Sequence, residues 1–151
     1  MKLLVCFDGS EQSHKAVKAA KDLALTAEKK EITLLHVYPE KEDSYWKAVE
    51  ENRPRPSKEL SGHERLQIEK FMNIKKMAGE VKEDLEKANI RVNKKIIKGE
   101  PVEKITEIAE KEGYDLIIIG NRGLGGLKKF MLGSVSNGVI QEAKGNVLVV
   151  K

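Results

Sequence analysis

Short apolar runs alternate along this chain with segments of helical periodicity, and this alternation constrains the fold more than any other feature. The runs are KLLVCF (2–7), ITLLHV (32–37), RVNKKIIK (91–98), YDLIIIG (114–120) and NVLVV (146–150). Most are continuously apolar, which is typical of parallel strands in a sheet that is covered on both faces. Parallel strands joined through helices need right-handed crossovers. The sequence therefore predicts an α/β fold with an open five-stranded parallel sheet and helices on both faces.

Apolar residues at steps of three and four predict helices between these runs. The helices are expected over 16–27, 71–88, 101–109 and 134–143. Ser10 is placed to cap the start of the first helix, and Pro101 suits the first position of the third. Ser134 is expected to cap the fourth.

Composition limits the class of protein. A chain of 151 residues is the size of one domain, so we expect a single domain over 1–151. Cys6 is the only cysteine, which excludes an internal disulfide and a cysteine-rich zinc site. The 28 basic and 24 acidic residues are interspersed, which argues against a nucleic-acid surface. No stretch approaches the ~18 apolar residues of a membrane span. We expect a cytoplasmic protein that binds neither nucleic acid nor a membrane.

Residues 39–64 break the alternation. They hold three of the four prolines, a charge-rich background and an isolated SYW. We expect a long irregular insertion here with a short helix at 44–51. It can be a plain insertion loop, or a lid or interface arm; long surface insertions cost little free energy, which favours the plain loop.

The stretch GNRGLGGLKKFMLGS (120–134) is rich in glycine and joins an apolar run to a predicted helix. Such a loop lets the backbone approach a ligand closely, and a helix N-terminus favours a phosphate. It lacks the G-x-x-x-x-G-K-[ST] string of the Walker loop. The G-x-G-x-x-G dinucleotide fingerprint is also missing, because the first strand is followed only by FDGSEQ.

The loop has instead Gly120-x-x-Gly123, then nine residues, then Gly133-Ser134. This G-2x-G-9x-G-S spacing resembles the ATP-binding subgroup of the universal stress protein family. LLVCFDGSEQS, LLHVY, KGEPVEKI and GNVLVVK are similar, in order, to further segments of that family. Cys6 departs from the proline, valine or alanine common in the family at that position. Nothing about residues 39–64 is carried over.

The resemblance implies the strand order 3-2-1-4-5, a Rossmann-like arrangement similar to that of the adenine nucleotide alpha hydrolases. In such a sheet a ligand binds at the carboxyl ends of the strands where the order reverses. This reversal falls between the strands that end in Asp8-Gly9-Ser10 and in Gly120. The implied ATP-binding residues are Cys6, Asp8, Val37, Gly120, Asn121, Arg122, Gly123, Gly133, Ser134, Val135 and Ser136, with Gly99 as a weaker candidate.

Each of these residues has an expected role. The glycines would let the backbone approach ribose and phosphates, Ser134 would bond a phosphate oxygen, and Val37 and Cys6 would border the adenine. Asp8 would face the nucleoside, or as a second choice a Mg²⁺ or Mn²⁺ ion bound with ATP, since a bare carboxylate repels phosphate. Turn glycines, a plain helix cap and core positions remain the alternatives for single residues. No pair of histidines has metal-ligand spacing.

The resemblance implies an ATP-binding module for stress response or signalling that hydrolyses ATP slowly at most. It also implies a homodimer that pairs through the edge strand at 146–150, and a protein partner of unknown identity. One alternative is an ATP-hydrolysing or adenylating enzyme of a related fold, although the Ser-Gly-Gly-x-Asp-Ser loop usual in such enzymes is missing here. The other is an interaction module that binds no nucleotide.

Overall fold

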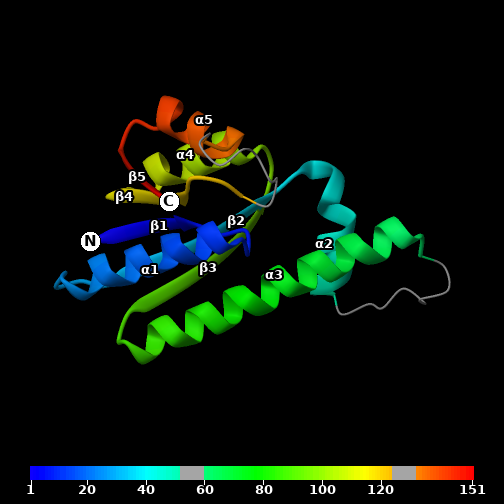
Figure 1. The fold of residues 1–151 in the computed structure, drawn as a ribbon, viewed down its shortest axis with the longest axis horizontal. Helices are drawn as coiled ribbons and strands as arrows, with labels where there is room; N and C mark the ends of the chain where they lie inside the picture. The colour runs from blue at the N-terminus through cyan, green and yellow to red at the C-terminus, as the bar shows by residue number, and fades with distance from the viewer. Residues whose placement is uncertain (52–59, 124–131) are drawn as a thin grey trace.

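The computed structural model describes residues 1–51, 60–123 and 132–151. Its strands are β1 (Lys2–Cys6), β2 (Glu31–Tyr38), β3 (Arg91–Lys98), β4 (Leu116–Gly120) and β5 (Asn146–Val150). Its helices are α1 (Glu11–Leu25), a short 3-10 helix η1 (Glu40–Glu42), α2 (Asp43–Glu50), α3 (Gly62–Lys87), α4 (Pro101–Lys111) and α5 (Ser134–Glu142). Strands and helices alternate along the chain (Figure 1).

The strands form one parallel sheet in the order β3-β2-β1-β4-β5, which confirms the predicted fold. The chain leaves β1 toward β2 on one side and later returns to β4 on the other. Leu3, Leu4 and Val5 of β1 pair with Leu116, Ile117 and Ile118 of β4. The order of the strands therefore reverses between β1 and β4, where an open sheet leaves a crevice at its carboxyl edge.

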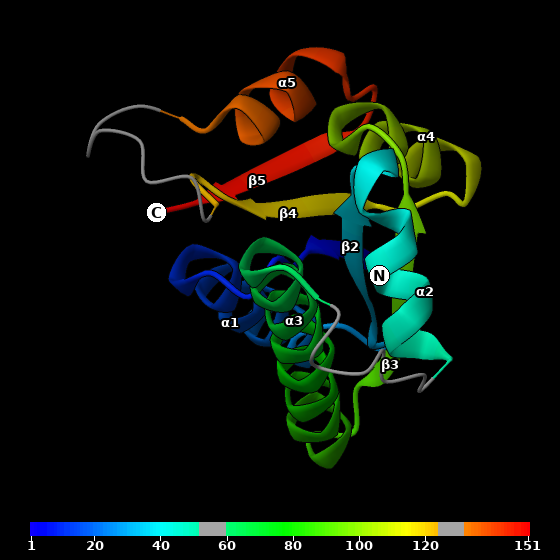
Figure 2. The same ribbon diagram turned by 90° about the vertical axis from the view of Figure 1, so that its right-hand side faces the viewer.

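Helices cover both faces of the sheet. Helices α1 and α3 lie on one face, and α4 and α5 lie on the other (Figure 2). Because alternate strand residues point to opposite faces, Leu3 and Val5 pack toward α1 while Leu4 packs toward α4. This two-sided burial explains why the strands are continuous apolar runs.

Local sequence signals fix where the helices begin. The Ser10 side chain accepts a hydrogen bond from the Ser13 amide at 3.1 Å, so the predicted cap of α1 is confirmed. Pro101 occupies the first turn of α4, also as predicted. Helix α3 begins at Gly62, earlier than its apolar periodicity indicates. A capping box formed by Ser61 and Glu64 sets this start.

The described residues of the segment 39–64 are mostly helical rather than irregular. The short helix expected at 44–51 is present as α2, and α3 begins within the same segment; residues 52–59 lie outside the described part. Trp46 is not isolated, because it packs with Tyr38, Phe71 and Ile74 in a separate buried cluster. We call η1, α2 and residues 62–74 of α3 the arm. It extends past the carboxyl ends of the strands (Figure 1).

Candidate functional site

A cavity of about 280 Å³ opens at the carboxyl edge of the sheet, where β1 and β4 are neighbours. This volume is close to the ~300 Å³ lower limit of small-molecule sites. The described residues that line it are Cys6, Phe7, Asp8, Ser13, Leu35, His36, Val37, Pro101, Ile105, Ile119, Gly120, Arg122, Gly123, Gly133, Ser134, Val135 and Ser136. They come from β1, β2, β4 and the N-terminal ends of α1, α4 and α5.

The structure gathers most of the predicted ATP-binding residues at this one place. All of them except Asn121 line the cavity, and the weaker candidate Gly99 does not reach it. Residues 124–131 of the glycine-rich loop lie outside the described part of the chain. The wall contributed by Pro101 and Ile105 of α4 was not predicted, because the sequence marks Pro101 only as a helix start and Ile105 only as part of the apolar face of the helix.

The N-terminal end of α5 faces the cavity with its backbone amides. Gly133 is the N-cap, with φ −64° and ψ 157°, and no side chain caps the helix among the described residues. The expectation that Ser134 caps this helix is wrong, because Ser134 is already its first helical residue. First-turn N–H groups have no partner within a helix and carry its positive dipole end. The first turn of α5, with the amides of Ser134, Val135 and Ser136, therefore lies beside the cavity with the polarity that favours an anion.

Asn121 and Ser136 hold the two ends of the glycine-rich loop together. The Gly133 amide donates to the Asn121 carbonyl at 2.8 Å, and the Ser136 hydroxyl donates to the same carbonyl at 3.0 Å. The Asn121 amide in turn donates to the Val150 carbonyl at 2.7 Å. Asn121 thus supports the loop through its backbone, which explains its place outside the cavity lining.

Gly120 is required for packing against protein rather than only for approach to a ligand. A Cβ at this position would lie 2.8 Å from the carbonyl carbon of Gln12 and 2.9 Å from its carbonyl oxygen. Real Cβ atoms do not come this close to backbone atoms. The first turn of α1 can therefore pack on the end of β4 only if residue 120 has no side chain.

Asp8 is the only carboxylate among the described residues that line the cavity. Its Oδ1 accepts a hydrogen bond from the Ser10 amide at 2.9 Å. A Cβ at Gly123 would lie 2.5 Å from its Oδ2, so this oxygen is directed at the second glycine of the motif. The turn after β1 and the loop after β4 therefore meet through the Asp8 carboxylate.

Cys6 and His36 have ionisation properties that follow from burial. Burial, with a smaller contribution from the charge of Asp8, raises the pKa of the Cys6 thiol to about 12. Burial also lowers the pKa of His36, although its bond to a backbone carbonyl and the charge of Asp8 act in the opposite direction. The thiol is therefore neutral at pH 7, and burial favours the neutral form of the imidazole. Both offer the cavity an uncharged wall.

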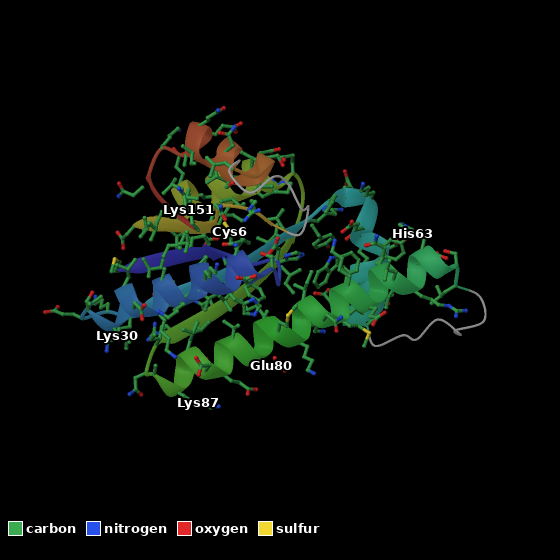
Figure 3. The ribbon with its side chains drawn as sticks, in the orientation of Figure 1. Cys6, Lys30, His63, Glu80, Lys87 and Lys151 are labelled. Carbon is green, nitrogen blue, oxygen red and sulfur yellow. The ribbon has the colours of Figure 1, made fainter. Side chains whose placement is uncertain are left out.

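The described residues contain no group of three or more His, Cys, Asp or Glu side chains that could hold a metal ion. His36 borders the cavity, while His63 lies at the outer end of α3, away from Cys6 (Figure 3). Within the ranges 1–51, 60–123 and 132–151, no helix has the length and apolar character needed to cross a membrane.

An open parallel sheet with a cavity at its switch point, bordered by a helix N-terminus, defines a Rossmann-like α/β fold. The sequence comparisons then identify the family. The model of the universal stress protein family matches residues 1–151, and the chain belongs to this family.

Similar proteins match almost the whole chain. Universal stress protein MJ0577 of Methanocaldococcus jannaschii is 36% identical, over 99% of this chain and 94% of its own; its solved structure superposes with a TM-score of 0.75. Universal stress protein YxiE of Bacillus subtilis is 34% identical, over 99% and 98% of the two chains. A universal stress protein solved in complex with cAMP has a TM-score of 0.65 at 23% identity, over 100% and 96%, which is a likeness of fold alone.

Proposed function

We propose that this chain is an ATP-binding universal stress protein, a nucleotide-dependent module of a stress response or of signalling. The observation that carries the proposal is the position of the α5 N-terminus beside a cavity at the switch point of the sheet. That arrangement provides an apolar compartment for a base and backbone donors for phosphates. A universal stress protein with this fold has been solved in complex with cAMP, an adenine nucleotide.

The lining divides into two parts that match the two parts of a nucleotide. Cys6, Val37 and Ile105 line the cavity with uncharged side chains. We assign the adenine to this surface, with the backbone of Val37 as its hydrogen-bonding partner. Ser134, Val135 and Ser136 present first-turn amides to the phosphates, next to Gly133 and Arg122. Because the hydroxyl of Ser136 is used within the loop, that residue contributes through its N–H group.

Asp8 is assigned to the nucleoside end of the ligand. Its Oδ1 is held by the Ser10 amide, which leaves Oδ2 on the side of Gly123 to accept from a ribose hydroxyl. A divalent ion that arrives with ATP, Mg²⁺ or Mn²⁺, is the second assignment. Asp8 would supply only one carboxylate to such an ion. Phosphate oxygens and water molecules would have to fill the remaining coordination positions.

A mass spectrum of the natively purified protein, followed by calorimetric titration of the ligand-free protein with ATP, tests the function directly. We expect a co-purifying adenine nucleotide and saturable binding of ATP at one site per chain. A protein that carries no nucleotide and releases no heat with ATP, ADP or AMP would instead support the interaction module that binds no nucleotide.

We expect the protein to hold ATP far better than it hydrolyses it. Hydrolysis needs an oriented water molecule and positive charge that stabilises the transition state. Backbone amides that bind the phosphates equally in the ground state and the transition state leave the barrier nearly unchanged. Asp8 at the nucleoside end cannot act as a base on the attacking water. Single-turnover hydrolysis, with and without Mg²⁺, should be far slower than the roughly 10 s⁻¹ median of enzymes. A rate of several per second that Asp8→Asn removes would contradict this assignment.

We also propose a homodimer through β5, the apolar strand at one edge of the sheet. Its residues Val147 to Val150 are only half-buried in the single chain, and a bare apolar edge favours pairing with a second copy. Val149→Lys should raise the dimer dissociation constant about tenfold or more, since the charge must be buried in the interface. Light scattering over a concentration series measures this change.

The opposite edge strand provides the control for the dimer. Ile97→Lys places the same charge at a half-buried position of β3 and should leave the dimer intact. A wild-type chain that stays monomeric at high concentration, or an equal effect of both substitutions, would exclude the β5 interface.

A further inference from the structure

The aromatic cluster of the arm contacts the end of β2 through His36. Trp46 and Phe71 are each 1% exposed, with their ring centroids 4.6 Å apart. Trp46 also contacts Tyr38 at 5.2 Å and His36 at 5.4 Å between ring centroids. His36 lines the cavity as well. One residue therefore belongs both to the wall of the cavity and to the buried cluster of the arm.

His36 makes its second contact to the turn that carries Asp8. Its Nδ1 lies 2.9 Å from the Phe7 carbonyl oxygen, and since a carbonyl can only accept, Nδ1 is the donor. Phe7 directly precedes Asp8, and both residues line the cavity. The imidazole thus joins Trp46 of α2 to the backbone of the Asp8 turn.

Helix α3 touches the same turn at a second point. Gly9 has a φ of +80°, and a Cβ there would lie 2.5 Å from Cε of Met77 and 3.6 Å from Cγ1 of Ile74. Ile74 is itself a member of the aromatic cluster. The turn at residues 8–10 therefore has the His36 ring on one side and α3 on the other. His36 contacts Trp46 directly, and Ile74 of α3 belongs to the same buried cluster as Trp46.

We propose that His36 is a positioning residue that couples occupancy of the cavity to the aromatic cluster of the arm, an inference that rests on the proposed binding of ATP. A ligand that orders the Asp8 turn fixes the Phe7 carbonyl, and with it the imidazole that packs on Trp46. By linkage, an arm that holds the imidazole in place strengthens ligand binding to the same degree. The arm is then the part of the fold that responds to the bound nucleotide.

Trp46 is the only tryptophan of the chain, so its emission reports on the arm without labelling. The test compares two curves on the ligand-free wild-type protein. Equilibrium dialysis with radiolabelled ATP measures binding, and tryptophan emission, excited where adenine does not absorb, measures the response of the arm. We expect emission to change on addition of ATP and to saturate at the same dissociation constant as dialysis.

Two substitutions of His36 separate its two contacts. His36→Phe keeps a ring against Trp46 but loses the donor to Phe7, and it should weaken ATP binding about tenfold, as expected for a buried carbonyl left without its partner. His36→Asn keeps a donor near the Nδ1 position but loses the ring against Trp46, so its emission response should be lost while its affinity falls by less than that of His36→Phe. Tyr38→Phe, which removes only the bond to Asp43 in the same cluster, is the control and should leave both curves unchanged.

The outcomes distinguish this inference from the proposed function. If dialysis shows ATP binding but Trp46 emission stays constant at saturation, the coupling is wrong while the ATP site remains. Equal losses of affinity in the Phe and Asn variants would show that His36 has only a structural role. If the wild-type chain binds no ATP by dialysis, the proposed function fails, and this inference fails with it.

Discussion

Gly133→Val is expected to abolish ATP binding while leaving the fold largely intact. The backbone of Gly133 is in the extended region, which valine adopts without strain. A Cβ there would lie 3.4 Å from Cα of Arg122 and 3.6 Å from the Asn121 carbonyl oxygen, which are ordinary contacts. The two further methyl groups of valine have to extend into the loop junction or the cavity beside it. They therefore compete with the phosphates for the space at the α5 N-terminus.

Calorimetry measures this effect, with Gly145→Val as the matched control. Gly145 precedes β5, does not line the cavity, and has no atom within 4 Å of an added Cβ among the described residues. Gly145→Val should bind ATP as wild type does, and both variants should unfold near the wild-type temperature. Equal ATP binding by Gly133→Val and wild type would show that the phosphates lie elsewhere.

Gly120→Ala should produce the largest loss of stability from a single added methyl group. The new Cβ would overlap the backbone of Gln12, which cannot rotate away as a side chain can, so α1 must move off the end of β4. Overpacking of this kind costs about 1–3 kcal/mol, and this site should fall at the upper end of that range. Urea unfolding of the two proteins gives the difference in free energy.

Gly79→Ala is the control for the same chemical change. Gly79 lies inside α3, and an added Cβ there has no neighbour within 4 Å among the described residues. Alanine should raise the free energy of unfolding by about 0.5–1 kcal/mol, because glycine is the poorer helix former. A Gly120→Ala protein as stable as wild type would show that α1 and β4 are not so closely packed.

The sequence predicts the layered fold well because its signals are local. Because the sheet is buried on both faces, its strands are continuous apolar runs in the sequence. Ser10 marks the start of α1 as a capping side chain, and Pro101 marks the start of α4 because proline suits the first turn of a helix. The arm is less visible, because residues 62–70 extend past the sheet and carry no long apolar stripe. The Ser61 and Glu64 pair of the capping box is the one local signal that would have located the start of α3.

The candidate site is predicted in position but not in detail. The glycine spacing and the strand ends lead to the cavity, because parallel strands bring their carboxyl ends to one edge. The reason for Gly120 cannot be read from the sequence, since Gln12 is remote along the chain and meets it only through tertiary packing. The role of His36 cannot be read from the sequence either, because Phe7 and Trp46 meet it only through tertiary packing.

The buried thiol has a consequence for how such a protein can respond to oxidants. Peroxides and electrophiles react with the thiolate, and burial, which raises the pKa of Cys6 to about 12, keeps this thiol protonated at pH 7. The chain has no second cysteine with which a sulfenic acid at Cys6 could form an internal disulfide. We therefore expect Cys6 to react slowly with oxidants, and the chain by itself offers it no disulfide partner.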